Sequence, residues 1–111
     1  MSLAGLHLTA IGQGRFLLEP GSGLDIGQKD ALIVGILSRL QEGEGSELYY
    51  HLGSVPLIDQ AYYDWLDALA RSCITINVRM ICVHMQPTAA FALSHMLKGP
   101  PSFASALTLD L

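Results

Sequence analysis

The sequence predicts an α/β domain in which a mixed β-sheet is packed with helices, in the order β-β-α-β-α-β-α-β. Two stretches carry this prediction. Residues 48–59, LYYHLGSVPLID, indicate an apolar strand that passes a glycine turn and ends on an acid, and the helical pattern AYYDWLDALA follows. Residues 78–85, VRMICVHM, indicate a second apolar strand, which leads through Gln86-Pro87 into the helical segment TAAFALSHML. Strands that alternate with helices favour parallel pairing with right-handed crossovers.

The first part of the chain is predicted to be a hairpin followed by a helix. Residues 6–11 and 15–19 have strand patterns on either side of a Gly-Gln-Gly turn, which favours antiparallel pairing. Asp25 is expected to begin the helix, with Gln28 three residues later as in a variant capping box. The apolar residues of this helix fall at helical spacing on one face, at Ile33, Ile36, Leu37 and Leu40.

The middle of the chain is predicted to be a strand at residues 48–52 and a helix that Asp59 caps. The Asp59 carboxylate can accept hydrogen bonds from the free amides of the first helical turn. Asp64 and Asp67 are expected to face water. One apolar stripe is expected on this helix, with Ala61, Trp65 and Leu69 in line and Leu66 and Cys73 beside them.

The last part of the chain is predicted to be a central strand, a short helix and a final strand. Residues 78–85 are almost continuously apolar, as a parallel strand buried on both faces should be. Pro87 suits the first position of a helix, where its missing N–H has no partner. Residues 103–109 alternate as a short last strand. The apolar face of the helix is expected at Ala90, Leu93 and Leu97.

Composition limits the class of protein. The 111 residues fit a single domain over residues 1–111, and only 14% are charged. The net charge of −4 and the absence of a Lys/Arg cluster argue against nucleic-acid binding and against a polybasic membrane patch. No apolar run reaches the roughly 20 residues needed to span a bilayer. Two cysteines, Cys73 and Cys82, are not a disulfide framework, which favours a reducing cytoplasm.

Catalytic and cofactor motifs are missing from the sequence. The glycines bracket a hairpin and do not form a phosphate loop, and no nucleophile elbow of the GxSxG type occurs. His51 and His84 are expected on neighbouring strands, but their spacing is not that of a metal motif. Asp59 fits a helix cap better than a general base. We therefore expect a protein without enzyme activity, cofactor or metal.

The phrases at the strand ends resemble the STAS domain of anti-sigma-factor antagonists, over residues 6–109 and most clearly from residue 48. These phrases are LGSVPLID, His84-Met85-Gln86-Pro87 followed by Thr88-Ala89-Ala90, and the ending ALTL at residues 106–109. The closest resemblance is to the short stressosome scaffold type. The resemblance implies a STAS-like sandwich and regulated binding, in which a Ser or Thr after the acid is phosphorylated to release the partner.

Three features depart from the STAS pattern. The phosphoacceptor position falls on Gln60, which cannot be phosphorylated and would hold the binding-competent state permanently. His51 occupies a strand position where the family often has an acid. The terminal helix of the family is expected to be absent after Leu111. Ser94 corresponds to a second phosphoacceptor in some relatives, although an ordinary helix serine is the preferred interpretation.

The binding surface is expected at the loop 53–56 and at the start of the next helix, and it comprises Gly53, Ser54, Val55, Pro56, Asp59, Gln60, Tyr62 and Tyr63. The partners that the resemblance implies are an anti-sigma factor, a GHKL-type kinase or other STAS subunits, with a homodimer through a sheet edge as a further option. The alternative is an accessory subunit or tail domain of a membrane transporter, of the sulfate or lipid type. A small-molecule sensor at the Asp59 edge is the third hypothesis.

Overall fold

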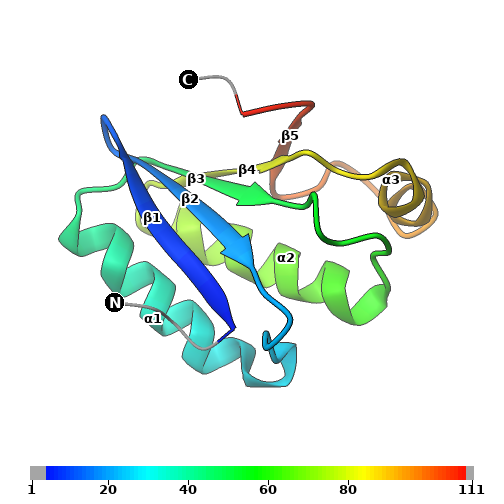
Figure 1. Ribbon diagram of the computed structural model, residues 1–111, viewed down its shortest axis with the longest axis horizontal. Coiled ribbons are helices and arrows are strands. Elements are labelled where there is room, and N and C mark those ends of the chain that lie inside the picture. Colours follow the sequence, from blue (N-terminus) through cyan, green and yellow to red (C-terminus); the bar gives the residue numbers. More distant parts are fainter. Residues whose placement is uncertain (1–4, 110–111) are drawn as a thin grey trace.

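The computed structural model describes residues 5–109 and contains one five-stranded sheet with three α-helices (Figure 1). The strands are β1 (Leu6–Gly12), β2 (Arg15–Pro20), β3 (Glu47–His51), β4 (Arg79–Val83) and β5 (Ala104–Ala106). The helices are η1 (Ile26–Gln28, a 3₁₀ turn), α1 (Lys29–Glu42), α2 (Gln60–Ile74) and α3 (Pro87–Ser94). The predicted α/β class and order of elements are confirmed.

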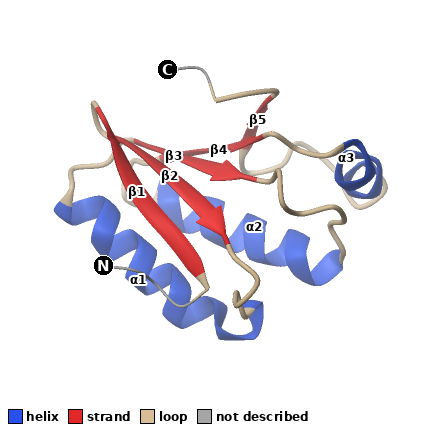
Figure 2. Ribbon diagram, viewed as in Figure 1, coloured by secondary structure: helices blue, strands red, loops and turns tan. Residues whose placement is uncertain are grey.

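The strands lie in the sheet in the same order as in the sequence. β1 and β2 form the expected antiparallel hairpin, and each later strand adds in parallel to the one before it. The two long helices, α1 and α2, lie side by side on one face of the sheet, and α3 lies beyond the carboxyl end of β4 (Figure 2). The carboxyl ends of β2, β3 and β4 therefore meet at one edge, where each strand continues into a loop and then a helix.

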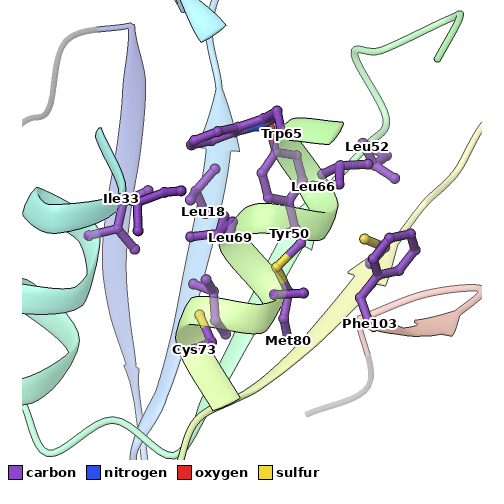
Figure 3. Close-up of a cluster of buried hydrophobic side chains, with 14 of the residues drawn as sticks. Leu18, Ile33, Tyr50, Leu52, Trp65, Leu66, Leu69, Cys73, Met80 and Phe103 are labelled. Carbon is purple, nitrogen blue, oxygen red and sulfur yellow. Dashed lines mark hydrogen bonds between the residues drawn. The ribbon is translucent and has the colours of Figure 1, made fainter. Parts of the chain in front are cut away.

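The core lies between the sheet and the two long helices (Figure 3). Strand residues alternate as a half-covered sheet requires, so that Phe16, Leu18, Leu48 and Tyr50 are buried. Trp65 on α2 has no exposed surface and lies against Tyr50. Burying such large side chains contributes roughly 1.5–3 kcal/mol each and supplies most of the stability.

Some sequence-based boundaries and faces are wrong. The strand predicted at residues 78–85 ends at Val83, because His84 has a φ of 57° and leaves the extended region. The last strand spans only Ala104–Ala106 and not residues 103–109. On α3 the buried alanine is Ala89, whereas Ala90 is exposed.

Two predictions about α2 are also corrected. Ala61, which was expected in the buried stripe, is exposed because it stands in the first turn, beyond the sheet-facing part of the helix. Asp67 was expected to face water but is half-buried. Its carboxylate accepts a hydrogen bond from the Ser102 hydroxyl at 2.6 Å and pairs with Arg71 at 2.9 Å. The contact with Ser102 crosses 35 residues of sequence, and periodicity cannot reveal a contact of that range.

Candidate functional site

The candidate site is the segment that joins β3 to α2, at the carboxyl edge of the sheet. Leu52 and Ile58 are buried and hold the two ends of this segment in the core. Between them, Ser54 and Pro56 are exposed, and Gly53 and Val55 are half-buried. Leu57, which the sequence reasoning did not single out, is 62% exposed. The Leu57 side chain therefore adds apolar surface to this loop.

Asp59 caps α2 as predicted. Its side chain accepts a hydrogen bond from the backbone N–H of Tyr62 at 2.8 Å, which satisfies one of the free amides of the first turn. Gln60 is the first residue of the helix and is exposed, and its side-chain amide donates to Asp64 at 2.9 Å. Gln60 is thus a neutral side chain between the carboxylates of Asp59 and Asp64.

The two tyrosines of the predicted surface point to different neighbours. The hydroxyl groups of Tyr62 and Tyr50 lie 2.6 Å apart, and the Trp65 indole N–H donates to Tyr50 at 2.9 Å. Burial raises the pKa of both Tyr50 and Tyr62, so both are neutral hydrogen-bonding groups at physiological pH. The Tyr63 ring instead packs edge-on against Phe103, 6.5 Å between centroids. Both tyrosines thus support the fold as well as border the surface.

The next crossover holds the loop in place. The Gln86 side-chain amide donates to the carbonyl of Gly53 at 2.7 Å, and the Thr88 hydroxyl donates to the carbonyl of Pro56. These bonds link the start of α3 to the loop that precedes α2. Gln86 and Thr88 lie in the Gln-Pro phrase noted in the sequence, but the phrase alone did not show that they bind this loop.

Two histidines occupy the same edge. The rings of His51 and His84 stack with their centroids 4.6 Å apart and their planes inclined by 26°. Their expected proximity is confirmed. Within residues 5–109, no group of three or more His, Cys, Asp or Glu side chains is arranged to hold a metal ion.

The charge at this edge is acidic. No Lys or Arg occurs between Arg39 and Arg71, while Asp59 and Asp64 are both exposed at the start of α2. A hollow of about 440 Å³ adjoins the loop and is lined by residues from the two loops after β2 and β3 and by Tyr62. Ser94, for which an ordinary helix serine was the preferred interpretation over a phosphoacceptor, lies on α3, where its hydroxyl donates to the carbonyl of Phe91 at 2.7 Å.

No protein-family model matches the sequence, and no curated protein matches it. Solved structures do match. A serine-to-glutamate variant of RsbS from Moorella thermoacetica is similar with a TM-score of 0.74 and 15% identity, over 94% of this chain and 87% of that one. A chain of the stressosome, a signal integration and transduction hub, is similar with a TM-score of 0.64 and 14% identity, over 93% of this chain and 89% of that one. The anti-sigma factor antagonist SpoIIAA in its unphosphorylated form is similar with a TM-score of 0.58 and 13% identity, over 96% of this chain and 88% of that one.

These similarities establish the class of fold. The chain has the α/β fold of STAS-domain regulatory proteins along nearly its whole length, as the sequence resemblance implied. No helix within residues 5–109 is both long enough and apolar enough to cross a membrane.

Proposed function

We propose that this chain is a non-catalytic protein-interaction module that works as an anti-sigma-factor antagonist or as a subunit of a stressosome-like scaffold. The observation that supports this most is the similarity over more than nine-tenths of the chain to three proteins of that kind. A likeness of fold does not by itself define a function. The site adds support, because it combines an anchored loop with a capped helix end.

The proposed binding surface comprises the loop 53–58 with the first turn of α2. Ser54, Pro56 and Leu57 provide exposed contact area on a loop whose carbonyl groups are held by Gln86 and Thr88. A preorganised loop loses little conformational freedom when it binds, which favours affinity. Asp59 and Asp64 favour a partner that presents basic groups to this edge.

Gln60 determines how the proposed surface would be regulated. A phosphate on a residue at this position would add nearly two negative charges beside Asp59. Glutamine cannot be phosphorylated, and its side-chain amide donates a hydrogen bond to the Asp64 carboxylate. We propose that the surface stays competent for binding without the phosphorylation switch.

The test is capture of partners from a lysate of the native host, with membranes solubilised and proteins identified by mass spectrometry. A kinase-type anti-sigma factor or other STAS-fold subunits would support the proposal, and purified partner would then give a Kd. A permease or an ATP-driven transporter would contradict it and favour a transport accessory. A catalysed reaction of this chain would contradict its non-catalytic assignment.

Surface variants then locate the interface. Gln60→Glu adds charge to the acidic edge, and Leu57→Ser removes the exposed apolar contact, so both should weaken binding at unchanged stability. Gln41→Glu is the matched control, since it makes the same change at an exposed position of α1. Tyr63→Ala is less informative because Tyr63 packs on Phe103 and its loss also destabilises the fold. Equal Kd values for Gln60→Glu, Leu57→Ser and wild type would place the interface elsewhere.

A further inference from the structure

The stacked pair of His51 and His84 is built into the loop by hydrogen bonds that need unprotonated nitrogens. His51 Nδ1 accepts a hydrogen bond from the backbone N–H of Gly53 at 3.1 Å. His84 Nε2 accepts a weaker one from the backbone N–H of Leu109 at 3.5 Å. A ring nitrogen that accepts a hydrogen bond carries no proton, so this arrangement requires both imidazoles to be neutral.

His84 is also held in an unusual backbone conformation. Its φ of 57° lies in the left-handed region, which few residues other than glycine adopt. Its own N–H donates to the carbonyl of Leu107 at 3.2 Å, which ties the end of β4 to the segment after β5. Backbone strain of this kind occurs at switches and binding sites more often than elsewhere.

The same hydrogen bonds connect the pair to the proposed binding surface. Gly53 donates its N–H to His51 and accepts from Gln86 through its carbonyl, so both sides of this peptide segment are held. Two residues further on, the Val55 N–H donates to the carbonyl of Leu52 at 3.0 Å. A change in the His51 ring therefore acts directly on the first turn of the loop.

We propose that the histidine pair is a proton-sensitive latch on the loop 53–58. At neutral pH the uncharged rings stack and His51 holds Gly53. Histidine is the side chain that ordinarily changes charge between about pH 5 and 8. A proton on His51 Nδ1 removes the acceptor of the Gly53 amide, and a proton on each ring places two like charges at the 4.6 Å separation of the stack. The loop is then released.

One carboxylate on the neighbouring strand β2 stands near this end of the sheet. On β2, Glu19 comes directly after the last residue paired with β3, Leu18, and it pairs with His7 of β1. No ion pair within 4 Å links Glu19 to a histidine among residues 5–109.

The remaining elements around the pair contribute little charge. The same face of the sheet carries Glu47 on β3 and Arg79 on β4, at the opposite end of these strands. The start of α3 presents the neutral Gln86 and Thr88, and β5 carries no charged residue. A proton on one ring opposes a proton on the other, because the two ring centroids lie only 4.6 Å apart.

The latch can be tested on the wild-type chain without any partner. NMR would follow the imidazole signals of His51 and His84 and the backbone amides of Gly53 and Val55 from about pH 8 to pH 5. We expect the Gly53 amide to shift in step with the His51 ring. Protection of the two amides against exchange, corrected for intrinsic rates, should fall by about twofold to tenfold, as loss of one hydrogen bond implies. Loop amides that stay constant while His51 titrates would overturn the proposal.

Two variants separate the latch from a merely structural role. His51→Asn keeps an oxygen that can accept from the N–H two residues on, but it cannot take up a proton, so the loop should become independent of pH. His84→Asn tolerates the left-handed backbone and removes the second charge, so His51 should titrate in one step. His95→Asn, at the exposed end of α3, should behave as wild type.

The variants also have outcomes that contradict the proposal. A loop that still responds to pH in His51→Asn, or a two-step titration of His51 that persists in His84→Asn, would overturn it. The effect on a partner, weaker binding at about pH 5.5 than at pH 7.5, rests on the proposed function. A loop that opens on protonation while partner affinity stays constant would reject the proposed surface and keep the latch.

Discussion

The hydrogen-bonded chain from Trp65 through Tyr50 to Tyr62 gives the sharpest prediction about stability. Trp65 and Tyr50 have no exposed surface, so the Trp65 indole N–H cannot turn to water if its partner is removed. Tyr50→Phe removes only one oxygen atom and leaves the packing of the ring intact. The change in the free energy of unfolding therefore reports the hydrogen bonds and not a cavity.

The expected loss in the free energy of unfolding follows from the number of polar groups that Tyr50→Phe leaves without a hydrogen-bond partner. An unsatisfied buried donor costs about 1–3 kcal/mol, and the lost bond between the two tyrosines costs about 1 kcal/mol more. Tyr50→Phe should thus destabilise the domain by about 2–4 kcal/mol. Tyr62→Phe loses only the second bond and should cost about 0.5–1.5 kcal/mol.

Urea denaturation of wild type, the two single variants and the double variant measures both values. With an m-value of roughly 1–3 kcal/mol/M, a loss of about 3 kcal/mol lowers the midpoint by roughly 1–3 M. The double variant should match Tyr50→Phe alone, since the bond to Tyr62 is already lost. A Tyr50→Phe variant no less stable than Tyr62→Phe would refute the reasoning.

Three further predictions concern caps, turns and thiols. Asp59→Ala should lower stability by about 1 kcal/mol, with Asp59→Asn close to wild type, by urea denaturation. Gly5→Ala should destabilise the domain more than Gly12→Ala. Both glycines have a positive φ, but of the two only Gly5 would bring an added Cβ onto backbone atoms, at 2.3 Å. Similar melting temperatures for the two variants would contradict this prediction. Burial raises the pKa of Cys73 and Cys82 from 9.0 to about 12, so their contribution is present below pH 9 and lost as pH rises towards 12. The free energy of unfolding, from urea denaturation, should therefore fall by roughly 1–1.5 kcal/mol per thiol between about pH 8 and pH 10, and a constant value would contradict this prediction.

Much of the fold was predictable because its signals are local. Strand patterning and the Gln-Pro phrase predicted the elements and their order, and the Asp59 cap lies where its position implied. The errors arise where a contact between distant residues or an unusual backbone conformation determines the local structure. The left-handed conformation of His84 ends β4 early, and the Asp67–Ser102 bond joins positions 35 residues apart.

The candidate site was predictable in outline only. The loop and the helix start were predicted as one surface, and the nearness of His51 to His84 followed from adjacent parallel strands. The sequence did not show that Tyr62 completes a buried hydrogen-bonded chain or that Gln86 and Thr88 hold the loop. Such bonds depend on side-chain positions brought together by the tertiary fold.

The sequential order of the strands has a consequence for how the chain folds. Each strand pairs with the one that precedes it in the sequence, so no pairing must wait for a segment from the other end of the chain. The β1–β2 hairpin closes a short loop, and every later pairing closes a single crossover. A parallel pairing that closes a crossover forms more slowly than a local hairpin. The hairpin can therefore act as the first template, onto which β3, β4 and β5 add in the order in which the ribosome delivers them.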